Sequence, residues 1–210
     1  AVDPFETMDK FGADAARWYM ITNAQPWDNL KFDIAGIEEV RRKFFGTLYN
    51  TYAFFALYAN VDNFTYSEDD VPLNERPEID RWILSELNTL IDEVTDGLES
   101  YEPTRAFRAI GDFVNDKLSN WYVRLCRRRF WKGEMGTDKL SAYQTLYTCL
   151  ETVARLGAPL APFYMDRLFG DLNEATGKDK SESVHLASWP KSDKSMVDAD
   201  LEERMHLAQQ

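Results

Sequence analysis

The side chains best suited to chemistry lie together on one predicted helix in the middle of the chain. An α-helix turns by about 100° per residue, so Asn120, Arg124, Arg127 and Trp131 fall within roughly 60° of one another. They flank the apolar stripe of that helix, and Arg128 lies between the two sets. Guanidinium groups beside an exposed indole ring can pair with phosphates and stack on unpaired bases, which is the chemistry of a single-stranded RNA surface.

The charge pattern sets this helix apart from the rest of the chain. The formal net charge is −12, whereas residues 103–133 hold eight cations and two acids, so this segment is +6 and the remainder is −18. A basic segment in an acidic chain suits selective binding of one anionic partner. On spacing and charge alone, the simpler interpretation is still that the arginines neutralise acidic neighbours and interact favourably with the helix dipole.

Apolar residues at helical spacing predict the elements that position this face. The predicted helices span 3–22, 34–60, 78–100, 103–133 and 138–157, followed by a shorter helix ending near 172 and an acidic one starting near 198. Residues 23–29 are predicted to form a loop, 61–77 an acidic connector, and 173–196 a polar stretch with a short extended piece at 184–186. Long helices joined by short loops predict an all-α fold, an antiparallel helical bundle.

Two details of the helical stripes bear on the structure. Arg41 is the one polar residue in the stripe of the helix 34–60. In the helix 103–133 the predicted buried stripe consists of Phe107, Ile110, Val114, Leu118, Trp121 and Leu125. We therefore expect Trp121 to pack in the core.

The rest of the sequence offers no catalytic constellation. His185 and His206 lie in different segments without partner motifs, and no Gly-rich phosphate loop is present. Cys126 and Cys149 lack metal or redox spacing and are expected to be reduced, part-buried residues of a cytosolic protein. No apolar run approaches the roughly 20 residues of a membrane span. We expect a piece of a longer cytoplasmic protein, with no metal, membrane partner or catalytic residue.

A long string within the basic helix resembles a known family. Residues 119–131 read Ser-Asn-Trp-Tyr-Val-Arg-Leu-Cys-Arg-Arg-Arg-Phe-Trp, similar to the Ser-Asn-Trp-Tyr-Ile/Val-Arg-x-x-Arg-Arg-Arg-Phe-Trp run of class I isoleucine–tRNA ligases. Weaker matches follow the family's order and extend over most of the chain, from residue 3 to about residue 190; they lie at 3–4, 12–19, 80–88, 160–163 and 183–190.

The resemblance implies a fold and a role. The family has an all-helical anticodon-binding bundle here, expected at 34–172, after a stem-contact segment at 1–33 and before a C-terminal connector and partial helix at 173–210. The expected partners are the tRNA for isoleucine and the catalytic domain of the parent enzyme. ATP and Mg²⁺ belong to that catalytic domain, which lies N-terminal to the bundle and carries the active-site signatures. We therefore expect this chain to form no isoleucyl-adenylate by itself.

Individual roles follow from the same resemblance. Arg124, Arg127 and Arg128 are expected to contact phosphates, Trp131 to stack on a base and Asn120 to meet a base edge. Arg17 is expected to touch the inner corner of the tRNA.

Two alternatives remain open at this point. Valine-type synthetases share the bundle but lack the triple-arginine run. A helical protein-interaction module would instead bind through aromatic and apolar patches, and its affinity would be insensitive to salt, whereas RNA binding weakens steeply with salt.

Overall fold

The structure, a computed structural model, describes residues 2–209. It begins with two helices where the sequence predicted one, α1 (Pro4–Phe11) and α2 (Ala13–Asn23). Asp3 caps α1 by accepting hydrogen bonds from the amides of Phe5 and Glu6. The prediction of a single helix at 3–22 was wrong because Gly12 adopts φ +87°, a conformation that a helix does not tolerate and that glycine adopts readily.

The second predicted helix is continuous but contains a π-helical turn. α3 (Ile34–Val40) passes through a π segment at Arg41–Phe45 into α4 (Gly46–Asp62). A π turn holds one more residue than an α turn and rotates the chain after it. Arg41 is consequently exposed, while Phe44 and Phe45 are both buried, which explains the polar residue in the predicted stripe.

The connector and the following helix agree with the prediction. Residues 63–77 contain only a 3-10 turn at Leu73–Glu75, and α5 (Glu78–Glu99) then runs for 22 residues. Its predicted apolar stripe is buried at Ile83, Leu87, Leu90 and Val94, and Ile79 and Leu98 are partly buried at its ends.

The basic helix also contains a π segment, which changes the buried face. α6 (Pro103–Asp112) continues through a π segment at Phe113–Val123 into α7 (Arg124–Trp131). Beyond the segment, Tyr122, Cys126 and Phe130 are buried, whereas Leu125 is 54% exposed. The predicted stripe is therefore wrong at Leu125, because it assumed uniform α-helical turns. Trp121 is half-buried and packs against the core.

The chain ends with two long helices and a mostly irregular segment. α8 (Thr137–Gly157) and α9 (Pro162–Thr176) are followed by 3-10 turns at Val184–Leu186 and Lys194–Met196 and by α10 (Ala199–Gln209). The prediction of an extended piece at 184–186 was wrong. The Ser183 hydroxyl accepts from the His185 amide and Asp166 accepts from the Val184 amide, and these bonds close a turn.

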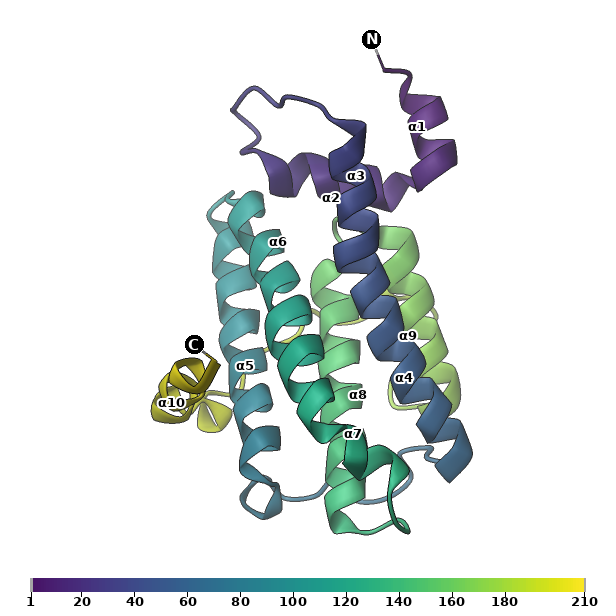
Figure 1. The fold of residues 1–210 in the computed structure, drawn as a ribbon, viewed down its shortest axis with the longest axis vertical. Coiled ribbons are helices and arrows are strands. Elements are labelled where there is room, and N and C mark those ends of the chain that lie inside the picture. The colour runs from purple at the N-terminus through teal and green to yellow at the C-terminus, as the bar shows by residue number, and fades with distance from the viewer. Residues whose placement is uncertain (1, 210) are drawn as a thin grey trace.

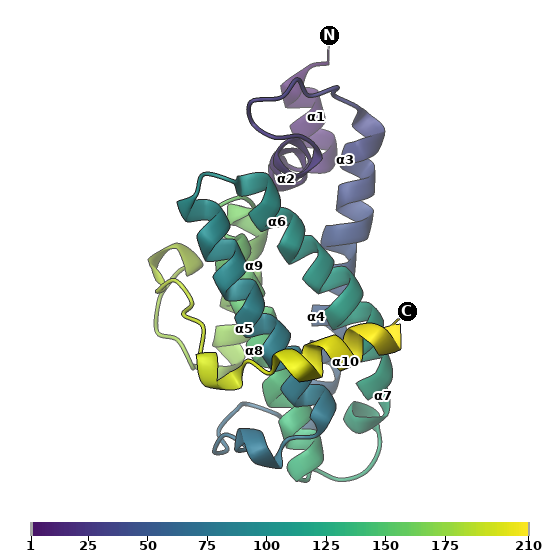
Figure 2. The ribbon, with the colours of Figure 1, turned by 90° about the vertical axis from the view of Figure 1, so that its left-hand side faces the viewer.

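These helices form the predicted antiparallel bundle (Figure 1). α4, the α6–α7 helix and α9 run in one direction, and α5 and α8 run in the other. α1 and α2 lie across one end of the bundle, α7 lies at the opposite end, and α10 crosses the outer side of α5 (Figure 2). The all-α fold class is confirmed, and residues 2–209 contain no strand.

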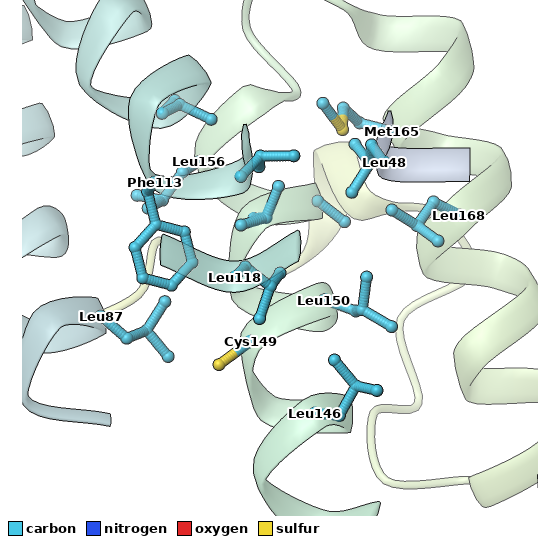
Figure 3. Close-up of a cluster of buried hydrophobic side chains, with 14 of the residues drawn as sticks. Leu48, Leu87, Phe113, Leu118, Leu146, Cys149, Leu150, Leu156, Met165 and Leu168 are labelled. Atoms are coloured by element: carbon cyan, nitrogen blue, oxygen red, sulfur yellow. The ribbon is translucent and has the colours of Figure 1, made fainter. Parts of the chain in front are cut away.

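The core lies between the bundle helices. Aliphatic side chains from four of them meet around α8, and their labelled members are shown in Figure 3: Leu48, Leu87, Leu118, Leu146, Leu150, Leu156 and Leu168. Nearer α7 the core is aromatic, with the Phe130 ring 5.1 Å from those of both Phe54 and Tyr143. Cys126 and Cys149 are buried and free of disulfide bonds.

The N-terminal helices are attached to the bundle by polar contacts at both ends of α2. Asp14 accepts a 2.7 Å hydrogen bond from the Tyr164 amide in the first turn of α9. At the other end, the Thr104 hydroxyl donates to the Ile21 carbonyl (2.7 Å). The expected division at 33 and 172 stays a prediction, and α2 packs directly on the bundle.

Among residues 2–209 no helix combines the length and the apolar character needed to cross a bilayer.

Candidate nucleic-acid interface

The predicted face is exposed at the end of the bundle that lies farthest from α1. Arg124, Arg127, Arg128 and Trp131 all lie on α7 with exposed side chains, and Asn120 is exposed on the π segment just before it. The Trp131 side chain is 64% exposed. The structure thus brings five of the six predicted residues together on one stretch of helix, residues 120–131.

The arginines of this face are not used internally. Within residues 2–209, Arg124, Arg127 and Arg128 make no side-chain hydrogen bond or ion pair with the protein. Each guanidinium group therefore keeps its five N–H donors available to solvent or to an external acceptor. Phosphate oxygens and base edges are acceptors of that kind.

The third arginine of the run behaves differently. Arg129 points inward and donates to both carboxylate oxygens of Asp80, at 2.5 and 2.8 Å. The Tyr122 hydroxyl donates to the same carboxylate at 2.8 Å and the Ser141 hydroxyl at 2.5 Å. Burial opposes the charge of Arg129, but its hydrogen bonds with Asp80 outweigh this and raise the guanidinium pKa. Burial and the Asp80 charge raise the pKa of Tyr122 well above its usual value, so the phenol stays a donor.

A second polar network holds the loop that follows α7. Lys139 forms an ion pair with Asp62 at the end of α4 (2.6 Å) and donates to the Gly133 carbonyl. The Tyr143 hydroxyl donates to the same carboxylate oxygen, Asp62 Oδ2 (2.5 Å). Burial alone would raise the pKa of Asp62, but its hydrogen bonds with Lys139 and Tyr143 lower it, so this carboxylate is charged at neutral pH.

Arg17 lies apart from the other predicted residues. It is on α2, at the opposite end of the bundle from α7. Its guanidinium group donates to Asp14 (2.7 Å) and to the Leu160 carbonyl (3.3 Å) and lies over the Phe163 ring. Its predicted contact with the inner corner of a tRNA stays a prediction.

The arrangement as a whole is suited to binding an anion. Unpaired cations and one exposed indole suit the phosphates and bases of an unpaired nucleic acid strand. Among residues 2–209, no group of three or more His, Cys, Asp or Glu side chains is placed to hold a metal ion.

The comparison with protein families assigns the chain to a family. The family model described as the anticodon-binding domain of tRNA ligase matches residues 80–210, well over half of the chain. The chain belongs to this family. The match begins at the start of α5 and includes the whole α6–α7 helix that carries the exposed arginines.

Relatives of this anticodon-binding domain are isoleucine–tRNA ligases. The chain is 70% identical over 209 residues to the one from Bacteroides thetaiotaomicron and 70% identical over 210 residues to the one from Porphyromonas gingivalis. Each match covers the entire chain but only 18% of the relative. The isoleucine–tRNA ligase of Cytophaga hutchinsonii is 67% identical over 99% of the chain and 19% of its own length.

A solved structure shares the fold. The LeuRS of a ternary LeuRS–tRNA–LeuAMS complex from Agrobacterium radiobacter K84 superposes with a TM-score of 0.69, covering 94% of this chain and 22% of that one. The two sequences are 22% identical, so this match supports the architecture of the anticodon-binding domain and no finer property.

The sequence did not reveal the inward role of Arg129 in this anticodon-binding domain. A signal was present, because Asp80 precedes Ile83, Leu84 and Leu87 at spacings of three, four and seven residues, which places a carboxylate on the buried face of α5. A buried carboxylate needs a cationic or hydrogen-bonding partner. Sequence alone does not say which of the three consecutive arginines reaches it.

Proposed function

We propose that this chain binds the tRNA for isoleucine, as the anticodon-binding part of an isoleucine–tRNA ligase. Arg124, Arg127 and Arg128 contact phosphates near the anticodon, Trp131 stacks on an unpaired base, and Asn120 meets a base edge. The observation that carries the proposal is that Arg124, Arg127 and Arg128 of α7 are exposed and unpaired within the described chain, although the chain is strongly acidic. The identity to isoleucine–tRNA ligases over the full length of the chain supports the choice of amino acid.

The parent enzyme in this proposal carries out the chemistry elsewhere. The chain spans about a fifth of the length of the relatives it matches. Activation of isoleucine with ATP and Mg²⁺ is assigned to a catalytic domain outside this chain. We place the enzyme in the cytoplasm, where the protein-synthesis reactions that use charged tRNA take place.

The end of the bundle opposite α7 is our candidate for docking that catalytic domain. Large apolar side chains are exposed there before and on α1, on α2 and in the loop before α3; they include Val2, Phe5, Met20, Trp27 and Phe32. Surfaces of this kind commonly pack against another domain. Docking at this end and anticodon contact at α7 would place the two ends of a tRNA at the two parts of the enzyme.

Titration of fluorescently labelled tRNA at two salt concentrations tests the proposal. The wild-type chain should bind, with affinity falling steeply as salt rises. Arg124→Ala combined with Arg127→Ala should weaken binding and flatten the slope of log affinity against log salt by roughly 0.7 to 0.9 for each phosphate that is no longer neutralised. Helix content should not change, because both side chains are exposed and without partners.

A matched control removes two exposed cations that do not lie on the α6–α7 helix. Arg42→Ala combined with Lys191→Ala lowers the net charge by the same two units. This variant should keep the salt slope of the wild type. Equal effects from the two double variants would show a general charge effect, and salt-insensitive binding would favour the protein-interaction module.

A further inference from the structure

The three consecutive arginines at 127–129 divide into two that face outward and one that is held inside. The Arg129 side chain is 15% exposed, and both of its terminal nitrogens are bonded to Asp80, whose side chain is fully buried. The pair is bidentate, which is the geometry in which a guanidinium group and a carboxylate bind most strongly. Arg129 also forms an ion pair with the Asp138 carboxylate at 3.0 Å and donates to the Asp138 carbonyl at 2.8 Å.

One buried carboxylate thereby connects three helices. Asp80 lies in the first turn of α5, Arg129 near the end of α7, and Ser141 in the second turn of α8. Arg128 and Arg127 immediately precede Arg129 in the chain. A displacement of the backbone at Arg129 would therefore also move Arg127 and Arg128, which lie in the same helical turn.

We propose that Arg129 is a positioning residue for RNA binding, which fixes the orientation of α7 through Asp80 and does not itself touch the RNA. This inference rests on the proposed function, because it assigns Arg129 a role in that same interface. Holding the arginines and Trp131 in their bound geometry beforehand lowers the ordering cost that binding would otherwise incur. A lysine in place of Arg129 keeps the charge but offers a single ammonium group, which has no planar fork to match both oxygens of Asp80.

The reactivity of a buried cysteine on α7 can report whether this helix is held in place. The Cys126 Sγ lies 3.5 Å from Arg129 Nη1, one turn earlier on α7, and is buried. Burial raises the pKa of this thiol to about 11, so the folded chain should react slowly with a maleimide. Cys149 is fully buried on α8 and reports opening of the whole bundle.

The experiment compares Arg129→Lys with a matched control, Arg155→Lys. The Arg155 side chain is 17% exposed and is likewise paired with two carboxylates, Glu151 (2.5 Å) and Asp179 (2.6 Å). It lies on α8 about 25 Å from Asp138, at roughly 1.5 Å of rise per residue. Both variants should melt at a lower temperature, so all measurements are made well below the lowest melting temperature.

Two quantities are measured on the same samples: the rate of N-ethylmaleimide modification at each cysteine, resolved by peptide mass spectrometry, and the affinity for labelled tRNA across salt concentrations. In Arg129→Lys, Cys126 should react several-fold faster while Cys149 stays protected. The tRNA affinity should fall on the order of tenfold with an unchanged salt slope, because the side chains are less ordered before binding while every phosphate contact is still made. Arg155→Lys should change neither quantity.

Other outcomes contradict the proposal in distinct ways. Protection of Cys126 in Arg129→Lys, or equal acceleration at Cys126 and Cys149, would overturn the anchoring role. Wild-type tRNA affinity despite a reactive Cys126 would overturn the link to RNA, and a flatter salt slope would make Arg129 a direct contact. If the wild-type chain binds no tRNA at any salt concentration, the proposed function fails, and the RNA part of this inference fails with it. The thiol rates then still decide whether Arg129 orders α7.

Discussion

Trp131 is an aromatic residue that the fold leaves in solvent, beside arginines that the fold leaves unpaired. Trp82, in contrast, is fully buried and donates to Glu86 through its indole nitrogen (3.1 Å). An indole that is 64% exposed contributes little to the core, and its large flat surface is available to a partner.

Replacement of Trp131 by alanine should therefore weaken RNA binding without weakening the fold. We expect a loss of about 1 to 3 kcal/mol of binding free energy, the usual contribution of one stacked base, and an unchanged salt slope. The melting temperature should stay near that of the wild type. Fluorescence anisotropy and thermal melting on the same samples measure both.

Trp27→Ala is the control for this change. Trp27 is 68% exposed, but it lies in the loop before α3, at the other end of the bundle from α7. The Trp27→Ala variant should bind RNA with the affinity of the wild type. If Trp131→Ala binds equally well, the indole of Trp131 does not stack on the RNA.

For single residues, the sequence predicts the exposed face of α7 correctly, but it does not predict which arginine pairs with a buried carboxylate. The face containing Arg124 and Trp131 is exposed as expected, because polar side chains beside an apolar stripe remain in water. The burial of Arg129 was not predictable from the run of three arginines. Its environment depends on Asp80, a residue that lies 49 positions earlier in the chain.

Among the elements, the two π segments are the places after which apolar periodicity no longer predicts the buried face of a helix. Each rotates the helix after it, so the predicted stripe fails at Leu125 although the helix itself is continuous. A prediction from apolar spacing assumes that every residue turns the helix by the same angle. The spacing of the apolar residues does not reveal a turn that holds one extra residue. At Gly12 the error is the reverse. Apolar spacing predicted one continuous helix, whereas the glycine separates α1 from α2.

The outer face of α5 binds the C-terminal segment through polar groups. Ser85 accepts from the Asp198 amide (2.8 Å), Asn88 accepts from the Asp193 amide (2.7 Å), and Asp92 accepts from Lys194. These α5 residues follow one another at helical spacing and form a polar ladder, which apolar periodicity cannot reveal. Attachment through a few hydrogen bonds, two of them part-buried and one exposed, makes this segment easier to open than the bundle beneath it.

The ladder predicts an effect of pH on the C-terminal segment. Hydrogen bonds from Lys194 and Ser192 lower the pKa of Asp92 below its ordinary value of 3.8. The charged carboxylate therefore stabilises docking above that value, and the contribution disappears as the pH falls through the lowered pKa of the folded chain. Amide hydrogen exchange in residues 188–198 of the wild type, corrected for the intrinsic rate, should accelerate as the pH falls below about 4.

Asp92→Asn imitates the protonated carboxyl at neutral pH. Trypsin should then cleave after Lys191 and Lys194 several-fold faster than in the wild type, while the melting temperature of the bundle changes little. Asp200→Asn removes an exposed carboxylate on α10 instead and should leave the cleavage rate unchanged. Identical cleavage of all three chains would show that Asp92 does not hold the segment.

For the molecule as a whole, the bundle was predictable and the placement of its appendages was not. Helices such as α5 and α8 bury long apolar stripes, which dictate packing against neighbours in chain order. The position of α2 depends instead on single contacts between distant residues, such as Asp14 with the Tyr164 amide. Such contacts have no period in the sequence.

The overall charge distribution leads to a kinetic prediction. Acidic residues of the connector, including Glu68 and Asp69, are exposed at the same end of the bundle as α7. Glu68→Gln with Asp69→Asn should raise the association rate with labelled tRNA a few-fold at low salt, because long-range repulsion is reduced. The gain should vanish at high salt, where the Debye length is about 3 Å at 1 M. Stopped-flow mixing at two salt concentrations measures it, and an unchanged rate at low salt would contradict it.

Because α2 and α7 lie at opposite ends of one bundle, the length of the bundle sets the distance between them. α8 runs for 21 residues between those ends, which at about 1.5 Å per residue is roughly 30 Å. α4, α5, α7 and α9 all pack against α8, so a helix that gained or lost a turn would displace its neighbours. The separation between a surface that touches α7 and one that touches α2 is therefore a fixed quantity. If the proposed function is correct, a tRNA whose contact points lie at a different separation would reach one end of the bundle and miss the other.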